Sequence, residues 1–144
     1  MLLGEYEHTL DEKKRLTLPA KFRRAFEDGC VVSRGFDGCL VAWTPDGWAN
    51  YQETTLATLS QLSREERQLH RYLLSGATDT TPDRQGRVLI PPTLVEHAKL
   101  NKDVVVTGVN DRLEIWDRDA WRRELSEVEG SAEDVAERLA AQRS

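Results

Sequence analysis

The chain contains an internal repeat, which constrains its fold more than any single predicted element does. Residues 11–20 run Asp-Glu-Lys-Lys-Arg-Leu-Thr-Leu-Pro-Ala, and residues 83–92 run Asp-Arg-Gln-Gly-Arg-Val-Leu-Ile-Pro-Pro. After one inserted position the likeness continues through the pairs Val31/Val104, Gly35/Gly108, Leu40/Leu113, Trp43/Trp116, Asp46/Asp119 and Trp48/Trp121. We therefore expect two modules, the first at 1–75 with connecting helices and the second at 76–144 with a C-terminal helix and tail.

Size and composition favour a globular protein. The chain has 144 residues, of which 39% are hydrophobic and 31% charged, as is usual for soluble domains. Two modules of roughly 70 residues are marginal alone, so we expect a shared core or oligomerisation. No apolar run approaches the roughly 18 residues that span a bilayer, and the N-terminus lacks the features of a signal peptide. We expect a cytoplasmic protein without a membrane partner.

The local patterns predict an α+β fold. Strands are expected at 5–10 and 15–18, joined by a turn into a hairpin, because 15–18 alternates apolar and polar residues. A short helix is expected at 20–26, with Phe22 and Phe26 on one face. Asp46 and Asp119 are predicted helix N-caps, and Ser63 with Glu66 forms a capping box for a helix that ends at Gly76. Further strands are expected at 30–33, 39–44, 77–81, 87–90, 104–106 and 113–116, with a helix from Pro91 and one or two more helical turns after Gly130.

The sequence contains few features that are typical of an enzyme. Its three histidines do not recur between the modules, and it has no nucleophile motif, metal-ligand spacing or glycine-rich phosphate loop. Cys30 and Cys39 have no counterparts in the second module and are expected to be reduced thiols on strands. A hydrolase using Asp11 and Asp83 is disfavoured, since Asp at a turn entry usually accepts backbone N–H groups. We expect no enzyme, cofactor, metal or small-molecule substrate.

The repeated Asp-x-x-x-Arg stretch is better interpreted as a binding device. The net charge is −5, yet residues 13–24 carry six basic residues and no acid, a pattern that fits both DNA binding and a solvated helix face. Basic side chains on the two turns are placed to neutralise phosphates, and an arginine at a strand start suits a guanine edge in the major groove. Alternatively, Arg15 and Arg87 pair with Asp11 and Asp83 and lock the turns. Both roles hold together if the acid orients the arginine.

The sequence resembles the MraZ family of bacterial regulators, within the swapped-hairpin AbrB/SpoVT superfamily. The resemblance covers residues 1 to about 125 and lies in Gly4, Leu10-Asp11, the run from Arg15 to Arg23, Gly76-Ala77, Asp83, Gly86-Arg87 and the run from Leu113 to Asp117. It implies two tandem swapped-hairpin β modules that form an intrachain pseudo-dimer barrel with connecting helices. The family's signature falls on Asp11/Arg15 and on Asp83/Arg87, with Gly86 supporting the second turn.

The resemblance also implies a function. It implies a DNA-binding regulator, at the nucleoid, that forms closed homo-oligomeric rings and binds repeated boxes in double-stranded DNA upstream of its own gene. That gene would stand at the head of the division and cell-wall gene cluster, and autorepression would be the usual output. The expected DNA-binding residues are Lys13, Lys14, Arg15, Lys21, Arg23, Arg84 and Arg87. The alternative is an antitoxin-like module that binds a protein partner.

One residue departs from the family pattern. Lys14 stands before the first motif arginine, where the family usually has glycine, as the second module does at Gly86. Because lysine tolerates a positive φ poorly, either the first turn has another shape or Lys14 accepts strain. The repeated tryptophans are expected to pack in the core or at an interface.

Overall fold

The computed structural model describes residues 1–144 and has a mixed α+β fold, as predicted. The first half contains β1 (Leu2–Thr9), β2 (Arg15–Thr17), η1 (Ala20–Phe26), β3 (Cys30–Arg34), η2 (Phe36–Gly38), β4 (Leu40–Trp43), α1 (Pro45–Thr54), η3 (Leu56–Thr58) and α2 (Arg64–Ser75). The second half contains β5 (Thr78–Thr80), β6 (Arg87–Leu89), α3 (Pro92–His97), β7 (Asp103–Asn110), β8 (Arg112–Asp117), α4 (Arg118–Glu129) and α5 (Ala132–Gln142).

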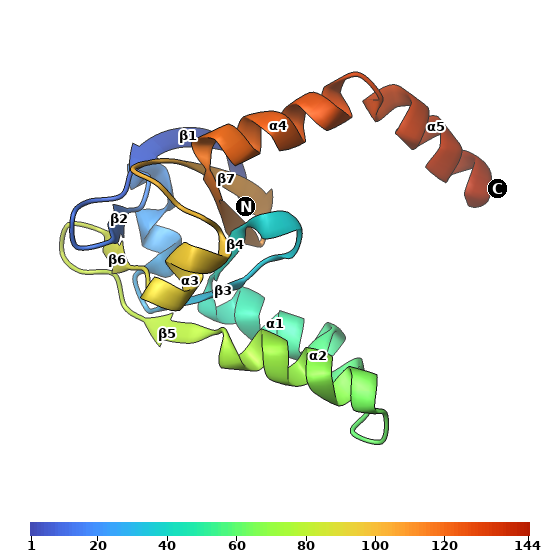
Figure 1. Cartoon of the computed structure of the whole chain (residues 1–144), viewed down its shortest axis with the longest axis horizontal. Coiled ribbons are helices and arrows are strands. Elements are labelled where there is room, and N and C mark those ends of the chain that lie inside the picture. The colour runs from blue at the N-terminus through green and yellow to red at the C-terminus, as the bar shows by residue number, and fades with distance from the viewer.

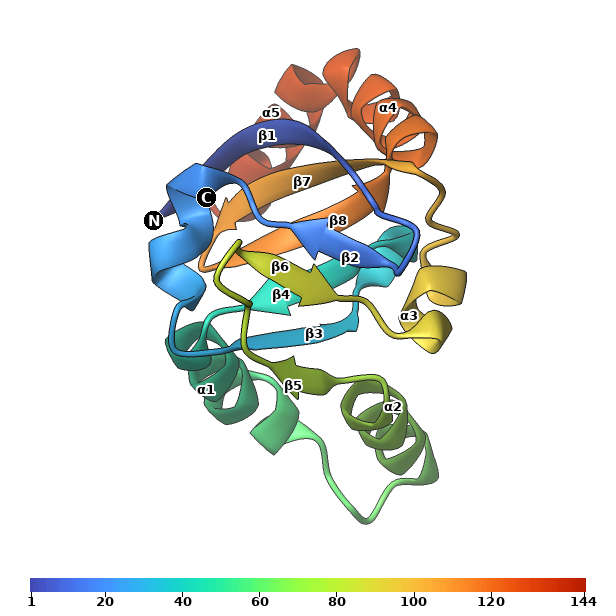
Figure 2. The same ribbon diagram turned by 90° about the vertical axis from the view of Figure 1, so that its left-hand side faces the viewer.

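The strands form two antiparallel sheets. The larger sheet has six strands in the order β1-β7-β8-β4-β3-β5, so the first strand of each module lies beside strands of the other module. The smaller sheet pairs β2 with β6 and lies over one face of the larger sheet, where Figure 2 looks directly onto it. The two modules thus share both sheets, as the marginal size of each module required.

The hydrophobic core lies between the two sheets. It contains 19 buried residues from both modules. Phe22 and Phe26 enter it from η1, and Leu94 enters it from α3. The Tyr6 and Phe22 rings pack edge to face at a centroid distance of 5.3 Å. The core therefore fixes the β2–β6 ribbon on the body of the protein.

The predicted hairpin and the predicted barrel are both wrong. Strand β1 pairs with β7 along its whole length, and it meets β2 only in an isolated bridge between Leu10 and Leu16. The six-stranded sheet is open, with β1 and β5 at its edges. Leu10 continues the pairing of β1 past its last residue, because its N–H donates to the Lys102 carbonyl at 2.8 Å. Its repeat counterpart, Pro82, has no N–H to donate, and β5 is only three residues long. Neither β1 nor β5 therefore forms a ladder with β2 or β6, and such pairing would be needed to close a barrel.

The helix ends correct three further predictions. Helix α1 is capped by Thr44, whose hydroxyl accepts the Gly47 N–H, and α4 by Asp117, which accepts the Ala120 N–H. Both caps lie two residues before the predicted Asp46 and Asp119. The Ser63 cap of α2 is confirmed, because its hydroxyl accepts the Glu66 N–H at 3.4 Å. Helix α5 has 11 residues, more than the one or two turns expected.

Two helical arms project from the body on the side opposite the motif turns (Figure 1). One arm contains α1 and α2, and the other contains α4 and α5, which carry the chain to its C-terminus. Neither α4 nor α5 buries any residue. None of the helices combines the length and the apolar character required to cross a membrane.

Candidate nucleic-acid interface

The β2–β6 ribbon presents the two motif arginines on its outer face. Arg15 pairs with Leu89 and Thr17 with Arg87, while Leu16 and Val88 pair between them and are buried. Residues paired across an antiparallel ladder share a face. The four outer side chains therefore form a rectangle of roughly 7 by 5 Å, with the arginines on one diagonal.

An aspartate in each turn holds the motif arginine in the same way. Asp11 Oδ1 accepts the backbone N–H groups of Lys13 at 2.9 Å and Arg15 at 2.8 Å, and its Oδ2 accepts Arg15 Nε at 2.8 Å. Asp83 repeats this with Gln85 N and Arg87 N, both at 2.9 Å, and with Arg87 Nε at 2.7 Å. The acid therefore locks the turn and orients the guanidinium at the same time, as the turn-lock interpretation predicts.

The locked guanidinium groups keep their terminal nitrogens free. The Asp11 and Asp83 carboxylates bind only Nε of Arg15 and Arg87, and neither arginine makes a side-chain hydrogen bond within the chain through its Nη atoms. Both arginines are about one-third exposed. Two parallel N–H donors on a fixed plane match the acceptor pair of a guanine edge or two phosphate oxygens.

The hydrogen bonds also set the charge of the two acids. The backbone N–H of Arg15 is the main cause that lowers the pKa of Asp11, and the Arg15 guanidinium adds to it. The N–H and guanidinium of Arg87 lower the pKa of Asp83 in the same order. Both carboxylates are therefore ionised at neutral pH, where a catalytic acid needs a raised pKa.

Lys14 adopts the strained conformation that the second turn assigns to glycine. Its φ is 63°, close to the 75° of Gly86. The two turns have the same backbone shape, which answers the question raised by the missing glycine. The ribbon depends on it, because the Lys14 carbonyl accepts the Ile90 N–H at 2.9 Å and the Gly86 carbonyl accepts the Leu18 N–H at 2.8 Å. Each turn is thereby tied to the strand of the other module.

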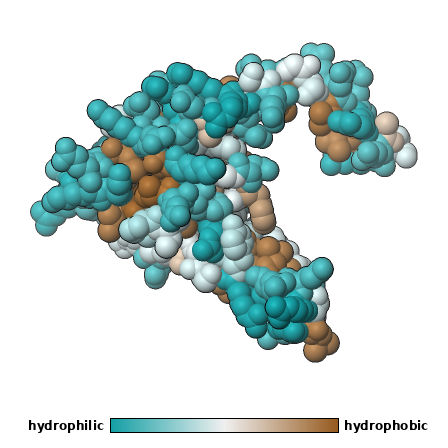
Figure 3. Space-filling model, viewed as in Figure 1, coloured by the Kyte–Doolittle hydropathy of each residue, from teal (hydrophilic) through white to brown (hydrophobic).

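The two turns lie at opposite ends of the ribbon (Figure 2), and each end carries additional cations. Lys13 and Lys14 are exposed on the first turn, and Arg84 is exposed on the second. Arg23 from η1 joins the second turn, because its Nε donates to the Leu18 carbonyl and its side chain lies against Gly86. Figure 3 shows the turns as hydrophilic projections at the left.

Lys21 lies apart from this cluster. It borders a groove with Met1, Leu2 and Arg24. A 3₁₀-helix places residues three apart on one face, so Lys21 and Arg24 share a face that Arg23 does not. The structure thus brings six of the seven expected basic residues to the ribbon and its turns and leaves Lys21 beside the N-terminus.

The other chemical groups serve packing. Burial raises the pKa of the Cys30 and Cys39 thiols to about 12, so neither is a thiolate nucleophile at neutral pH. Trp43 is buried and stacks on Tyr51 at 4.4 Å between ring centroids, and Trp116 is buried against Trp121. This confirms the expectation that the repeated tryptophans pack.

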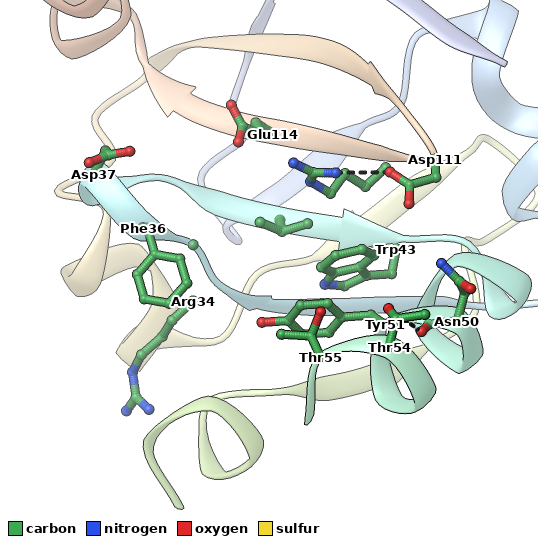
Figure 4. A pocket seen from close by; sticks show the side chains of 13 residues that line it. Arg34, Phe36, Asp37, Trp43, Asn50, Tyr51, Thr54, Thr55, Asp111 and Glu114 are labelled. Carbon is green, nitrogen blue, oxygen red and sulfur yellow. Dashed lines mark hydrogen bonds and ion pairs between the residues drawn. The ribbon is translucent and has the colours of Figure 1, made fainter. Parts of the chain in front are cut away.

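A groove of about 430 Å³ lies over β3, β4 and β8 beside α1, on the face of the sheet away from the ribbon (Figure 4). Arg112 spans it, bonded to Asp111 at 2.9 Å and with its guanidinium carbon 5.5 Å from the centre of the Trp43 ring. The Arg112 guanidinium is thus paired within the chain. No group of three or more His, Cys, Asp or Glu residues is placed to hold a metal ion.

Thr17 and Leu89 share the outer face with the arginines, although no motif in the sequence marks them as binding residues. Because side chains alternate along a strand, Thr17 lies on the same side of β2 as Arg15, and Leu89 lies on the same side of β6 as Arg87. The pairing of β2 with β6, which joins the four residues, is a contact between distant segments that the local pattern does not encode.

Known proteins resemble the chain along nearly all its length. The family described as "MraZ protein, putative antitoxin-like" matches twice, at residues 1–72 and 73–143. A protein of Roseiflexus sp. (strain RS-1) is 45% identical over 97% of each chain. Proteins of Ligilactobacillus salivarius and Caldanaerobacter subterraneus are 45% and 42% identical over 96% of each chain. All three are named "Transcriptional regulator MraZ". The chain belongs to the MraZ family.

Proposed function

We propose that this protein is a sequence-specific DNA-binding transcriptional regulator that represses its own gene. The observation that carries the proposal is the duplicated Asp–Arg lock, which presents two oriented guanidinium groups on one exposed two-stranded ribbon. The major groove admits such a ribbon, and an arginine bonded to guanine O6 and N7 is its commonest specific contact. The relatives' names support a role in transcription.

The cations around the ribbon support the same proposal. Lys13 and Lys14 at one end, and Arg84 and Arg23 at the other, are exposed, and we propose that they contact the phosphates that flank the groove. Phosphate contacts position a protein on the duplex, and base contacts specify the sequence. We assign the first role to these four residues and the second to Arg15 and Arg87. The target is repeated boxes upstream of this protein's own gene, at the head of the division and cell-wall cluster.

We further propose that subunits assemble head to tail into a ring. Large exposed apolar side chains occur on both arms: Leu62, Leu69 and Tyr72 on one, and Val128 and Leu139 on the other. Figure 3 shows apolar surface at the tip of the loop before α2 and on α5. Unlike surfaces that bind one another make a heterologous contact, which closes into a ring when the rotation permits.

The charges of the arms are complementary. Residues 124–137 contain six acids and no base. Arg64, Arg67 and Arg71 are spaced i, i+3, i+7 and so line one face of α2. Assembly would gather several ribbons and raise the effective concentration for repeated boxes.

The direct test is fluorescence anisotropy of labelled duplex from upstream of the gene, with a scrambled duplex of the same composition as control. We expect tight binding to the native duplex, with log K falling against log salt by about 0.9 per phosphate contacted, and much weaker binding to the scramble. Equal binding to both would leave an electrostatic patch without sequence specificity.

A second candidate is an antitoxin-like module, which the description of the matching family favours. Helix α5 buries no residue and offers a surface for a protein partner. A pull-down that returns one partner in fixed stoichiometry, together with no shift of upstream DNA, would establish this function in place of the first.

A further inference from the structure

An apolar side chain lies on the outer face of the ribbon. Leu89 is 57% exposed, although its strand neighbours Val88 and Ile90 are buried at 2% and 0%. The alternation of the strand fixes Leu89 outward. Its counterpart in the first module is Thr17, so the two modules differ at this position of an otherwise matched face.

Single exposed leucines are ordinary on protein surfaces, but the position of this one is special. Leu89 is the direct cross-strand partner of Arg15, so their Cβ atoms lie about 5 Å apart. Asp11 fixes the Arg15 guanidinium, which leaves Leu89 beside a group of defined orientation. Whatever Arg15 binds at the base edges lies next to the leucine.

The chemistry of the major groove supplies one apolar feature at the base edges. Adenine, guanine and cytosine offer hydrogen-bond donors and acceptors there, while thymine adds its C5 methyl group. A leucine side chain has no donor or acceptor, so it contributes to sequence readout through that methyl group. Thr17, at the other end of the face, is smaller and keeps a hydroxyl group.

We propose that Leu89 is a specificity-determining residue that contacts the C5 methyl group of a thymine beside the base bound by Arg15. The inference rests on the proposed DNA binding and deepens it. Because Thr17 at the other end has a smaller apolar surface than leucine, the apolar contact is stronger at the Leu89 end. The ribbon therefore has a preferred direction on its site, despite the repeat in its sequence.

The test replaces each thymine of the upstream duplex, one at a time, by deoxyuridine, which removes the methyl group and keeps the hydrogen-bonding edge. We expect one position at which replacement weakens binding about fourfold, which is the 0.8 kcal/mol of one buried methyl group converted at 1.4 kcal/mol per tenfold. Anisotropy at fixed salt measures the dissociation constants.

The variant Leu89→Ser removes the apolar side chain and leaves no methyl group in its place. We expect it to bind the thymine duplex about fourfold more weakly and to lose the difference between thymine and deoxyuridine. The matched control is Leu3→Ser, at a strand leucine that is 51% exposed on β1, away from the ribbon. It should bind as the unchanged protein does and keep the difference.

The outcomes separate the two proposals. No position sensitive to deoxyuridine, or a sensitivity that persists in Leu89→Ser, would overturn the thymine contact while leaving DNA binding intact. An equal loss on both duplexes in Leu89→Ser would show a contact with sugar or protein and would also overturn it. Failure of the unchanged protein to bind the upstream duplex would overturn the proposed function, and the thymine contact with it.

Discussion

At the scale of residues, the Asp–Arg lock is a unit with a duplicated geometry. The turn residues between acid and arginine are Glu-Lys-Lys in the first module and Arg-Gln-Gly in the second. The hydrogen bonds nevertheless agree within 0.1 Å for each matched pair. Acid and arginine therefore determine the turn, and the residues between them are free to differ in what they contact.

The lock predicts how the two acids titrate. The folded-state pKa of Asp11 and of Asp83 is lowered from 3.8. Their contribution to stability is thus fully present above pH 3.8 and is lost as pH falls through the lowered values. NMR titration of the carboxyl carbons measures both.

The variant Arg15→Ala provides an internal comparison. It should raise the pKa of Asp11 only part of the way to 3.8, because the backbone N–H donors remain, and leave Asp83 unchanged. Titration of both acids at 3.8 or above in the unchanged protein would contradict the lock.

Lys14 predicts a second measurable effect. A left-handed conformation costs a residue with a Cβ about 1 kcal/mol, and the greater freedom of glycine in the unfolded chain offsets part of the gain. Lys14→Gly should therefore stabilise the protein by about 0.5 kcal/mol in urea denaturation. Because the proposed phosphate contact of Lys14 is lost, the slope of log K against log salt should also become less negative by about 0.9.

Gly86→Ala is the matched control in the other turn. It should destabilise the protein, because φ is 75° and a Cβ would lie 2.6 Å from Arg23 Nε. A Lys14→Gly protein less stable than the unchanged one would show that the lysine side chain makes a stabilising contact.

At the scale of elements, the caps distinguish two aspartates that the sequence presents almost equally. Asp117 accepts the Ala120 N–H, whereas Asp119 lies inside the first turn of α4. Asp117→Ala should lower stability by about 1 kcal/mol, and Asp119→Ala by a few tenths through the helix dipole. Thermal unfolding of the two variants side by side measures the difference, and a larger loss in Asp119→Ala would reverse the assignment.

The sequence predicts most elements because they depend on local patterns. Period-two alternation at 15–18 and the proline at 19 locate β2 and η1. The predicted strand pairing was wrong where it depended on distant segments. Strands at 5–10 and 15–18 were expected to form a hairpin, yet β2 forms its ladder with β6, 72 residues away, and meets the preceding strand only through one bridge. Alternation specifies which face a strand buries and leaves its partner open. The acid and arginine of each lock were identifiable from spacing, whereas Leu89 required the register.

At the scale of the whole molecule, the motif turns and the arms lie on opposite sides (Figure 1). In the ring that we propose, this arrangement would leave the ribbon accessible. Leu139→Glu, which replaces an exposed apolar side chain of α5 by a charge, should lower the assembled mass in light scattering. Gln142→Glu on the same helix is the control and should leave the mass unchanged.

Loss of assembly has a consequence for DNA binding. Leu139→Glu should bind a single box as the unchanged protein does and bind several adjacent boxes more weakly, because avidity is lost. An unchanged assembled mass of the Leu139→Glu protein would mean that α5 does not take part in the contact between subunits.

The most direct measurement of the central claim is the ratio of affinities for native and scrambled duplexes in Arg15→Lys. Lysine keeps the positive charge but has neither Nε nor the planar pair of terminal nitrogens that Asp11 orients. If the locked guanidinium contacts a base, the ratio falls by about fivefold to 140-fold, since one bidentate pair contributes about 1–3 kcal/mol of discrimination, while affinity for the scramble stays the same. A ratio unchanged from that of the parent protein would mean that Arg15 supplies charge alone, and the account of base recognition by the ribbon would be wrong.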